Sequence, residues 1–292
     1  REKKMKRVLV LGSTGMAGHV ITMHLMKNPS FLVFNVSRRS RLNRHTALMD
    51  VMDIGRLDEY LREISPDVIV NCIGVLNQFA SAEKDRAVFL NSYLPHYLES
   101  KYKGSCTRVI HLSTDCVFSG KDGSYHENSF RDGDDFYART KAVGEIVNDK
   151  DITIRTSIIG PDMRPEGIGL FNWFMKSRGT IYGYTRVFWN GVTTLELAKL
   201  VEALLDSDTC GLVHFTNRNK ISKHQLLTIL KQQFNRSDIK IEEFDGIVSD
   251  KSLINTREDF AYPVPDYDEM IGKMKEWVYS NKPLYPHYFT GC

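Results

Sequence analysis

Three residues in the middle of the chain have the types and the spacing needed to reduce a carbonyl group. Tyr137 precedes Lys141 by one helical turn, so on a helix the two side chains share one face. An ammonium close to a phenol lowers the phenol pKa from about 10, which makes the phenol a usable proton donor. Thr114, which ends an apolar run, can hold a substrate oxygen beside that phenol. Tyrosine and lysine at this spacing also occur by chance on solvated helix faces, so the pattern needs support from other motifs.

A glycine-rich turn, Gly12-Ser-Thr-Gly-Met-Ala-Gly18, follows the first apolar run and leads into a segment with helical periodicity. Gly12 allows a tight turn, Gly15 lets the backbone approach a pyrophosphate, and Gly18 permits close packing of helix and sheet. Amide groups at the helix start favour phosphate. A strand before the glycines and a helix after them predict a dinucleotide site, with a purely structural turn as the alternative. The residues predicted to bind the cofactor here are Gly12, Thr14, Gly15, Met16 and Ala17.

A basic run follows the second predicted strand, where an NAD enzyme would place a carboxylate on the ribose. The run reads Ser37-Arg38-Arg39-Ser40-Arg41. Guanidinium groups suit a 2′-phosphate, so Ser37, Arg38 and Arg39 predict NADP, with NADPH preferred over NADH. The alternative is a solvated basic loop, which is what most charge runs are.

Two further segments have residues suited to the rest of the cofactor. Asp53 and Ile54 follow the second strand-helix unit, where a carboxylate can accept a hydrogen bond from the adenine amino group. The small residues Cys72, Ile73 and Gly74, at the end of a later strand, would let the chain pass under the adenosine and the phosphates. Polar and glycine residues at strand ends are equally good turn formers, so neither segment is specific by itself.

The elements that must position these residues alternate through the first half of the chain. Short apolar runs typical of strands covered on both faces occur at 8–11, 32–36, 68–70 and 109–112. Helical patterns lie at 16–26, 57–64, 88–100 and 140–147. This alternation predicts an α/β fold with a doubly wound parallel sheet of the Rossmann type.

The second half predicts a smaller C-terminal α/β lobe on the substrate side. A Gly/Pro-rich stretch at 160–169 opens it, and helical patterns follow at 194–205, 222–234 and 267–279. We expect an NAD(P)-binding domain of residues 1–160 plus about 190–215. The substrate-binding lobe then comprises about 161–189 and 216–292.

Together these motifs resemble those of an extended short-chain dehydrogenase/reductase, in the dTDP-4-dehydrorhamnose reductase-like group of sugar-nucleotide reductases. The resembling segments include 12–18, 66–71, 113–120, 137–145 and 155–157. The resemblance implies that Thr114, Tyr137 and Lys141 are catalytic, and that Tyr137 and Lys141 also contact the cofactor. It further implies hydride transfer from NADPH to a nucleotide-linked 4-keto-6-deoxysugar in surface polysaccharide biosynthesis, with the proton coming from Tyr137.

The sequence differs from related enzymes at positions that help to identify the reaction. Dehydratase relatives follow the Thr with Asp and Glu, but here Asp115 is followed by Cys116, which disfavours loss of water. Epimerase-reductases resembling GDP-fucose synthase use a Cys at this position with a His, and Asn172 stands where that His would be. Simple reduction is therefore the first choice. One alternative is an epimerase/reductase that uses Cys116, although this cysteine can equally be a small buried hydrophobic residue of the core. The other alternative is a non-catalytic regulatory subunit with a reductase fold.

The substrate side should recognise a nucleotide sugar, which needs stacking surface for the base and cations for the diphosphate. The second half is rich in aromatic residues, although aromatic residues at such density more often belong to the core. Asn172 is chosen because the resemblance places an Asn here. The residues predicted to bind substrate are Thr114, Asp115, Asn172 and Trp189.

Composition excludes several other classes of protein. The net charge of +3 is too small to predict a nucleic-acid partner. The five cysteines contain no C-x-x-C pair and the nine histidines no H-x-x-x-H spacing, so we predict neither a disulfide framework nor a metal site. The apolar run at 8–11 is too short for a signal peptide or a membrane span. We expect a cytoplasmic enzyme with no membrane partner, and a homodimer stays open.

Overall fold

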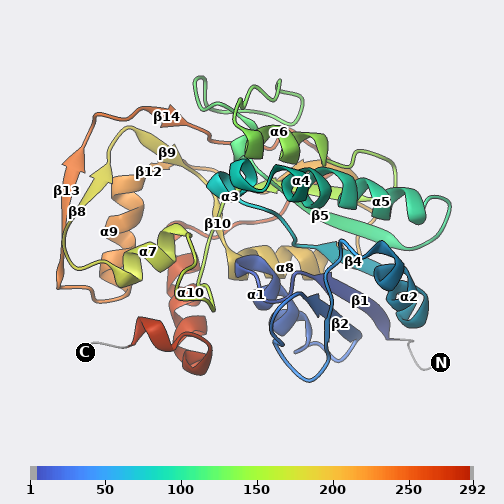
Figure 1. Ribbon diagram of the computed structural model, residues 1–292. Coiled ribbons are helices and arrows are strands. Elements are labelled where there is room, and N and C mark those ends of the chain that lie inside the picture. Colours follow the sequence, from blue (N-terminus) through green and yellow to red (C-terminus); the bar gives the residue numbers. More distant parts are fainter. Residues whose placement is uncertain (1–4, 290–292) are drawn as a thin grey trace.

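A seven-stranded parallel sheet forms the centre of the molecule (Figure 1). The computed structural model describes residues 5–289. In spatial order the strands are β11 (Gly211–His214), β6 (Ile152–Thr156), β5 (Arg108–Thr114), β4 (Val68–Asn71), β1 (Lys6–Leu11), β2 (Phe31–Ser37) and β3 (Thr46–Leu48). Neighbouring strands pair in parallel throughout this sheet. The arrangement confirms the predicted doubly wound Rossmann fold.

The strand order reverses at the middle of the sheet. β1 and β4 are neighbours, although β2 and β3 lie between them in the sequence. From β1 the chain extends the sheet to one side through β2 and β3, and then to the other side from β4 onwards. In doubly wound sheets, ligands bind beyond the carboxyl ends of the strands at such a point. The ends of β1, β2, β4 and β5 are therefore where a site is expected.

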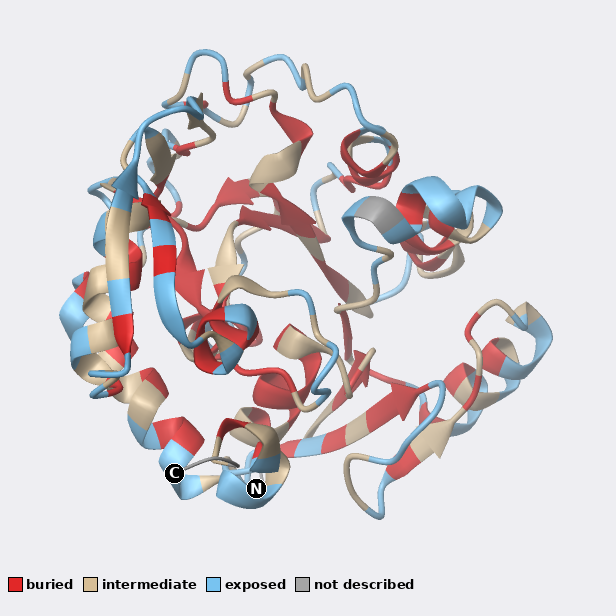
Figure 2. Ribbon diagram, turned by 60° about the vertical axis from the view of Figure 1, so that its left-hand side comes forward, coloured by how far each residue is buried: buried red, intermediate tan, exposed pale blue. Residues whose placement is uncertain are grey.

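Helices cover both faces of the large sheet (Figure 1). On one side lie α1 (Met16–Leu25) and α8 (Thr194–Leu204). The other side carries α2 (Ile54–Ile64), α3 (Asn77–Ala82), α4 (Lys84–Ala87), the π-helical η1 (Val88–Tyr93), α5 (Leu94–Lys101) and α6 (Phe136–Val143). Figure 2 shows the central strands buried along most of their length, which explains their unalternating apolar sequences. No helix within residues 5–289 is long and apolar enough to cross a membrane.

The smaller lobe contains short strands and the remaining helices. Its sheets are β13 (Ile239–Phe244) with β8 (Gly179–Tyr184), and β12 (Ile221–Ser222), β9 (Val187–Trp189) and β14 (Ser249–Asp250). β7 (Ile158–Ile159) pairs with β10 (Val192–Thr193). The helices are α7 (Leu170–Lys176), α9 (Lys223–Gln233) and α10 (Tyr267–Ser280). Short 3₁₀ turns occur at η2 (Asp115–Val117), η3 (Lys282–Leu284) and η4 (Pro286–Tyr288).

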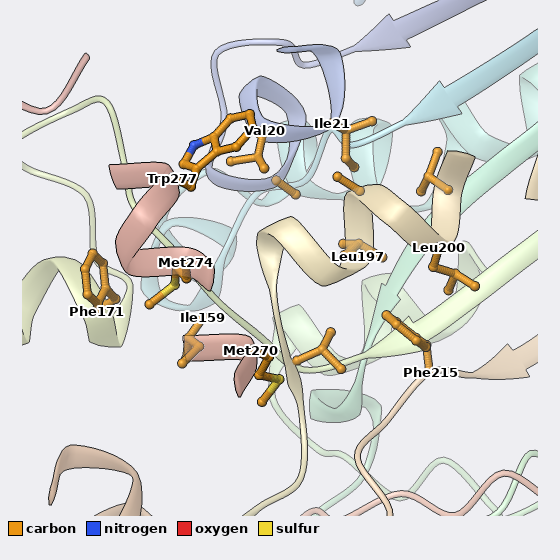
Figure 3. Close-up of a cluster of buried hydrophobic side chains, with 14 of the residues drawn as sticks. Val20, Ile21, Ile159, Phe171, Leu197, Leu200, Phe215, Met270, Met274 and Trp277 are labelled. Carbon is orange, nitrogen blue, oxygen red and sulfur yellow. The ribbon is translucent and has the colours of Figure 1, made fainter. Parts of the chain in front are cut away.

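One hydrophobic core joins the smaller lobe to the large sheet. Val20 of α1 and Leu197 of α8 belong to the same buried cluster as Phe171 of α7 and Trp277 of α10 (Figure 3). α10 also packs on α8. The two parts of the molecule therefore depend on each other for burial of apolar surface.

Three of the elements that differ from the sequence-based prediction lie next to predicted site residues. β3 is missed because three residues are too short to show periodicity. α6 begins before position 140, because Asp135 caps it by accepting a hydrogen bond from Ala138 N at 2.7 Å. α2 begins at Ile54, because Asp53 caps it by accepting from Arg56 N at 3.1 Å. Two of these differences affect the site described below.

The close approach of α1 to the turn before it gives a stability prediction. A Cβ at Gly18 would lie 2.1 Å from the backbone oxygen of Gly12, a contact that only a shift of α1 would relieve. We expect Gly18→Ala to lower the free energy of unfolding by about 1–3 kcal/mol, as overpacking does, measured by urea denaturation. Gly55→Ala is the matched control, because the nearest atom to its Cβ would be 3.6 Å away. Equal losses in the two variants would contradict the prediction.

Candidate active site

The three predicted reactive side chains meet where β5 ends beside α6. Thr114 is the last residue of β5, while Tyr137 and Lys141 lie one turn apart on α6. All three are buried, with at most 9% of their surface exposed. Thr114 Oγ1 accepts a hydrogen bond from Cys116 N at 3.1 Å and donates to Asp115 Oδ1 at 3.2 Å. The Thr114 hydroxyl also interacts with the Tyr137 phenol, and Lys141 follows on the same buried side of α6.

Burial controls the protonation of this cluster. Desolvation raises the pKa of the Tyr137 phenol and outweighs the opposing interaction with Thr114. The net direction is opposite to the lowering expected from Lys141, because burial dominates. Lys141 Nζ donates to Leu112 O at 2.6 Å and lies 3.4 Å from His111 Nε2. Desolvation also lowers the pKa of Lys141 to about 8. The phenol is protonated at neutral pH, which is the form that a proton donor needs.

A buried ion pair fixes the strand end that carries the reactive hydroxyl. Arg155 Nε and Nη2 donate to the two carboxylate oxygens of Glu145 at 2.9 and 2.7 Å, and Ser113 Oγ donates to the same carboxylate at 2.7 Å. Arg155 Nη1 lies 2.8 Å from His214 Nε2. Burial by itself raises the pKa of Glu145, but the hydrogen bonds from Arg155 and its other donors bring it below its usual value. β5, β6, β11 and the end of α6 are thus linked next to Thr114.

A cavity of about 470 Å³ opens beyond the ends of β1, β2 and β4. The predicted cofactor residues that line it are Gly12, Thr14, Gly15, Ser37, Arg38, Arg39, Cys72, Ile73 and Gly74. The other predicted cofactor residues lie outside its lining: Met16, Ala17, Asp53, Ile54, Tyr137 and Lys141. Cys72 interacts electrostatically with Lys141, so the cavity adjoins the reactive cluster. Lys141 lowers the pKa of the Cys72 thiol, but burial has the larger effect and raises this pKa to about 12.

The glycine turn fits the backbone of a dinucleotide. Gly12 has a φ of +84°, and a Cβ there would lie 3.0 Å from Ile73 Cγ1. Gly15 precedes α1 without any side-chain cap, so the first amides of that helix remain for a ligand. Backbone amides and the helix dipole together favour a pyrophosphate at this end of the cavity.

Guanidinium groups gather at the β2 end of the cavity. Arg38 Nη1 lies 3.8 Å and Arg86 Nη1 lies 3.5 Å from Asp50 Oδ2. Burial and the charges of Arg86 and Arg39 lower the pKa of Arg38, so the cations crowd one another. Asp50 and Glu83 line the same cavity and compensate part of this charge. The remaining positive charge suits a further phosphate group.

The aspartate that lines the cavity is Asp50 rather than Asp53. Asp50 lies just after β3 and lines the cavity, whereas Asp53 lies outside it and caps α2. The prediction chose the later aspartate because β3 is too short to recognise in the sequence. Arg86 was missed because it lies on α4, far along the chain from the basic run at 37–41. A basic residue on a short helix carries no motif that could have singled it out.

Asp115 interacts with two lysines of the smaller lobe and with a serine between β6 and β7. Its carboxylate interacts with Ser157, Lys223 and Lys251. Trp189 Nε1 donates to Ser157 Oγ at 3.0 Å, and Lys223 Nζ lies 5.3 Å from the centroid of the Trp189 ring. Burial raises the pKa of Asp115 and lowers the pKa of Lys223 to about 8. Lys223 and Lys251 were missed, because isolated lysines remote in sequence give no signal until the chain is folded.

The environments of Asn172 and Cys116 differ from those expected for a substrate ligand and a base. Asn172 is not exposed as a substrate ligand would be, and Cys116 is not ionised as an active base would be. Asn172 is fully buried, and its Nδ2 donates to Pro165 O at 3.1 Å and to Gly167 O at 2.6 Å. Its Oδ1 lies 3.2 Å from His287 Nε2. Burial raises the pKa of the Cys116 thiol to about 12, so this thiol is neutral at pH 7.

Known proteins share this architecture. A structure of dTDP-4-dehydrorhamnose reductase from Bacillus anthracis in complex with NADP superposes with a TM-score of 0.78 at 18% identity, covering 92% of this chain and 98% of that one. At this identity the likeness shows the fold alone. The chain is also 29% identical to the spore coat polysaccharide biosynthesis protein SpsK of Bacillus subtilis, over 78% of this chain and 80% of SpsK.

A further relative is named as a subunit of an enzyme and not as a reductase. The methionine adenosyltransferase 2 subunit beta of Xenopus tropicalis is 21% identical over 79% of this chain and 72% of its own length. Residues 5–252 match the family model described as the RmlD substrate binding domain, which is most of the chain. The protein therefore belongs to the RmlD substrate binding domain family, the dTDP-4-dehydrorhamnose reductase-like group of extended short-chain dehydrogenases/reductases.

Proposed function

We propose that the protein is an NADPH-dependent reductase of a nucleotide-linked 4-keto-6-deoxysugar, acting in surface polysaccharide biosynthesis. The observation that carries the proposal is the buried cluster of Thr114, Tyr137 and Lys141 beside a cavity suited to a dinucleotide. Membership of a sugar-nucleotide reductase family supports the substrate class. The relative SpsK, named for spore coat polysaccharide biosynthesis, supports the metabolic assignment.

In the proposed reaction, NADPH supplies the hydride that reduces the keto carbon. Tyr137 gives its phenolic proton to the keto oxygen, so the carbonyl becomes an alcohol and the phenol becomes a phenolate. Thr114 donates a hydrogen bond that holds the keto oxygen beside this phenol. Lys141, one turn along the same helix face, stabilises the phenolate by its positive charge until a proton from solvent restores the phenol. Asp115, as a substrate ligand, holds the sugar hydroxyls next to Thr114.

The cofactor is proposed to lie across the cavity. The Gly12–Gly15 turn and the start of α1 hold the pyrophosphate. Arg38, Arg39 and Arg86 bind the 2′-phosphate, and Asp50 replaces Asp53 as the acceptor for the adenine amino group. The complex of the Bacillus anthracis relative with NADP supports this choice of cofactor.

The likeness to methionine adenosyltransferase 2 subunit beta, a protein named as a subunit, favours a second candidate function. In that role this chain would regulate another enzyme without turnover of its own. The complete trio of Thr114, Tyr137 and Lys141 supports the reductase instead, because a retired site is free to lose such residues. Turnover distinguishes the two: a subunit oxidises no NADPH with any nucleotide 4-keto sugar, yet binds a separate enzyme tightly.

The arginine cluster predicts cofactor preference. In a double variant with Arg38→Ala and Arg86→Ala, we expect the KM for NADPH to rise about tenfold or more, because charged hydrogen bonds contribute about 1.5–3 kcal/mol. The KM for NADH should barely change, since NADH lacks the 2′-phosphate. Arg44→Ala, at an exposed residue of the loop between β2 and β3 that is outside the cavity lining, is the control. An equal rise in KM for NADPH and for NADH would contradict the assignment of these arginines to the 2′-phosphate.

Tyr137 predicts the origin of the proton. Tyr137→Phe keeps the buried ring and removes only the hydroxyl, so we expect NADPH oxidation with nucleotide 4-keto sugars to fall about 10²–10⁴-fold while NADPH still binds. Spectrophotometric assays with dTDP-, GDP- and UDP-linked substrates measure this. Tyr182→Phe, an exposed residue of β8, serves as the control. Full activity of Tyr137→Phe would exclude the mechanism.

The protonation state of Cys116 leads to a prediction about whether epimerisation accompanies reduction. Because its thiol is neutral at pH 7, we expect no deuterium from D₂O at C3 or C5 of the product, as read by mass spectrometry and NMR. Activity of Cys116→Ser should stay within about twofold of the wild type. Deuterium incorporation that disappears in Cys116→Ser would instead establish the epimerase/reductase.

A further inference from the structure

We infer that Tyr285 and His287, in the last described turn of the chain, are positioning residues that hold two opposite walls of the cofactor cavity. They lie in or next to η4, far in sequence from the residues that line the cavity. We call residues 285–288 the C-terminal strap. The inference rests on the proposed binding of NADPH, and names residues of that site that no motif in the sequence points to.

The first connection runs from the strap to the glycine turn. His19 Nδ1 lies 2.8 Å from Gly15 O, and His19 Nε2 lies 2.7 Å from Tyr285 Oη. A carbonyl oxygen only accepts, so the imidazole proton is on Nδ1. Burial lowers the pKa of His19, so the ring is neutral and Nε2 is free to accept. Tyr285 therefore donates to His19, and His19 donates to Gly15.

A third donor completes this chain. Trp277 Nε1, which has only a proton to give, donates to Tyr285 Oη at 3.0 Å. The order of donation is Trp277 to Tyr285, Tyr285 to His19, and His19 to the backbone of Gly15. Gly15 lines the cavity and precedes the first amides of α1. Trp277 of α10 and Tyr285 of the strap thus restrain the turn that would receive the pyrophosphate.

The second connection runs from the strap to the loop between β7 and α7. His287 Nε2 lies 3.2 Å from Asn172 Oδ1, and Asn172 Nδ2 donates to Pro165 O and Gly167 O. The backbone amide of Asp162 donates to Tyr288 Oη at 2.9 Å. Residues of this loop that line the cavity are Arg164, Glu166, Gly167 and Ile168. The sequence predicts Asn172 as a substrate ligand. In this proposal Asn172 instead connects the strap to the loop through its hydrogen bonds.

The strap is held tightly enough to act on both walls. Tyr285 is fully buried, and its ring stacks on that of Tyr288 with centroids 5.8 Å apart and planes 19° apart. A Phe at position 285 would keep this packing but leave His19 Nε2 and Trp277 Nε1 without their partner. Buried groups left unpaired are unfavourable, so the glycine turn would lose its preferred arrangement rather than its fold.

The experiment compares NADPH binding by the full chain and by Tyr285→Phe and His287→Ala, using fluorescence titration. We expect the dissociation constant for NADPH to rise about tenfold in each variant, which corresponds to the loss of about one buried hydrogen bond. Tyr279→Phe is the matched control, because Tyr279 lies on α10 but is 42% exposed. Thermal denaturation shows whether each variant is folded, and His287→Ala decides the question if Tyr285→Phe is not.

A spectroscopic measurement separates positioning from simple stabilisation. ¹⁵N NMR of the wild type should show His19 in the tautomer protonated on Nδ1, and this signal should change in Tyr285→Phe while the protein stays folded. Unchanged NADPH affinity in both variants, or His19 protonated on Nε2 in the wild type, would overturn the inference and leave the proposed function standing. A wild type that binds no NADPH would overturn the proposed function, and with it this inference.

Discussion

The geometry of the reactive cluster depends on a charged pair sealed inside the protein. The side chains of Arg155 and Glu145 are 2% and 0% exposed, and either charge alone would be strongly unfavourable in such a place. The bidentate contact between them, with the added hydrogen bond from Ser113, satisfies both charges. Ser113 precedes Thr114 on β5, and Glu145 lies two residues beyond the end of α6, which carries Tyr137 and Lys141. The pair therefore sets the distance between the strand and the helix that carry the reactive groups.

The cofactor cavity depends on contacts between segments that are distant in the chain. Its walls come from the ends of β1, β2 and β4, from α4, and from the loop after β7. The smaller lobe shares its hydrophobic core with α1 and α8, so the lobe and the glycine turn are packed as one body. This shared core explains how α10 can reach the glycine turn, from which it is distant in sequence. The architecture therefore couples the cavity mechanically to the smaller lobe.

The names of the relatives describe more than one role. A reductase bound to NADP and a protein named as an enzyme subunit both resemble the chain. The fold alone does not separate these roles, because function lies in the chemistry of the site. What favours catalysis here is local: a buried phenol protonated at neutral pH, a hydroxyl beside it, and a lysine on the same helix face. Each of these would be unnecessary in a protein that only binds another.

The sequence by itself was sufficient for the fold class and the glycine turn, and it predicted a trio of residues that the structure buries at the end of β5 and on α6. These features follow from local rules: apolar periodicity marks strands and helices, glycine at a tight turn is required by sterics, and spacing by one turn places Tyr137 and Lys141 on one face. Only the tertiary structure showed the choice of Asp50 over Asp53, and the presence of Arg86 and Lys223 at the site. These residues are brought in by pairing and packing between remote segments, which leaves no periodic trace in the sequence. The protonation of Tyr137 was likewise decided by burial, which depends on everything packed around the phenol and not on the lysine that follows it.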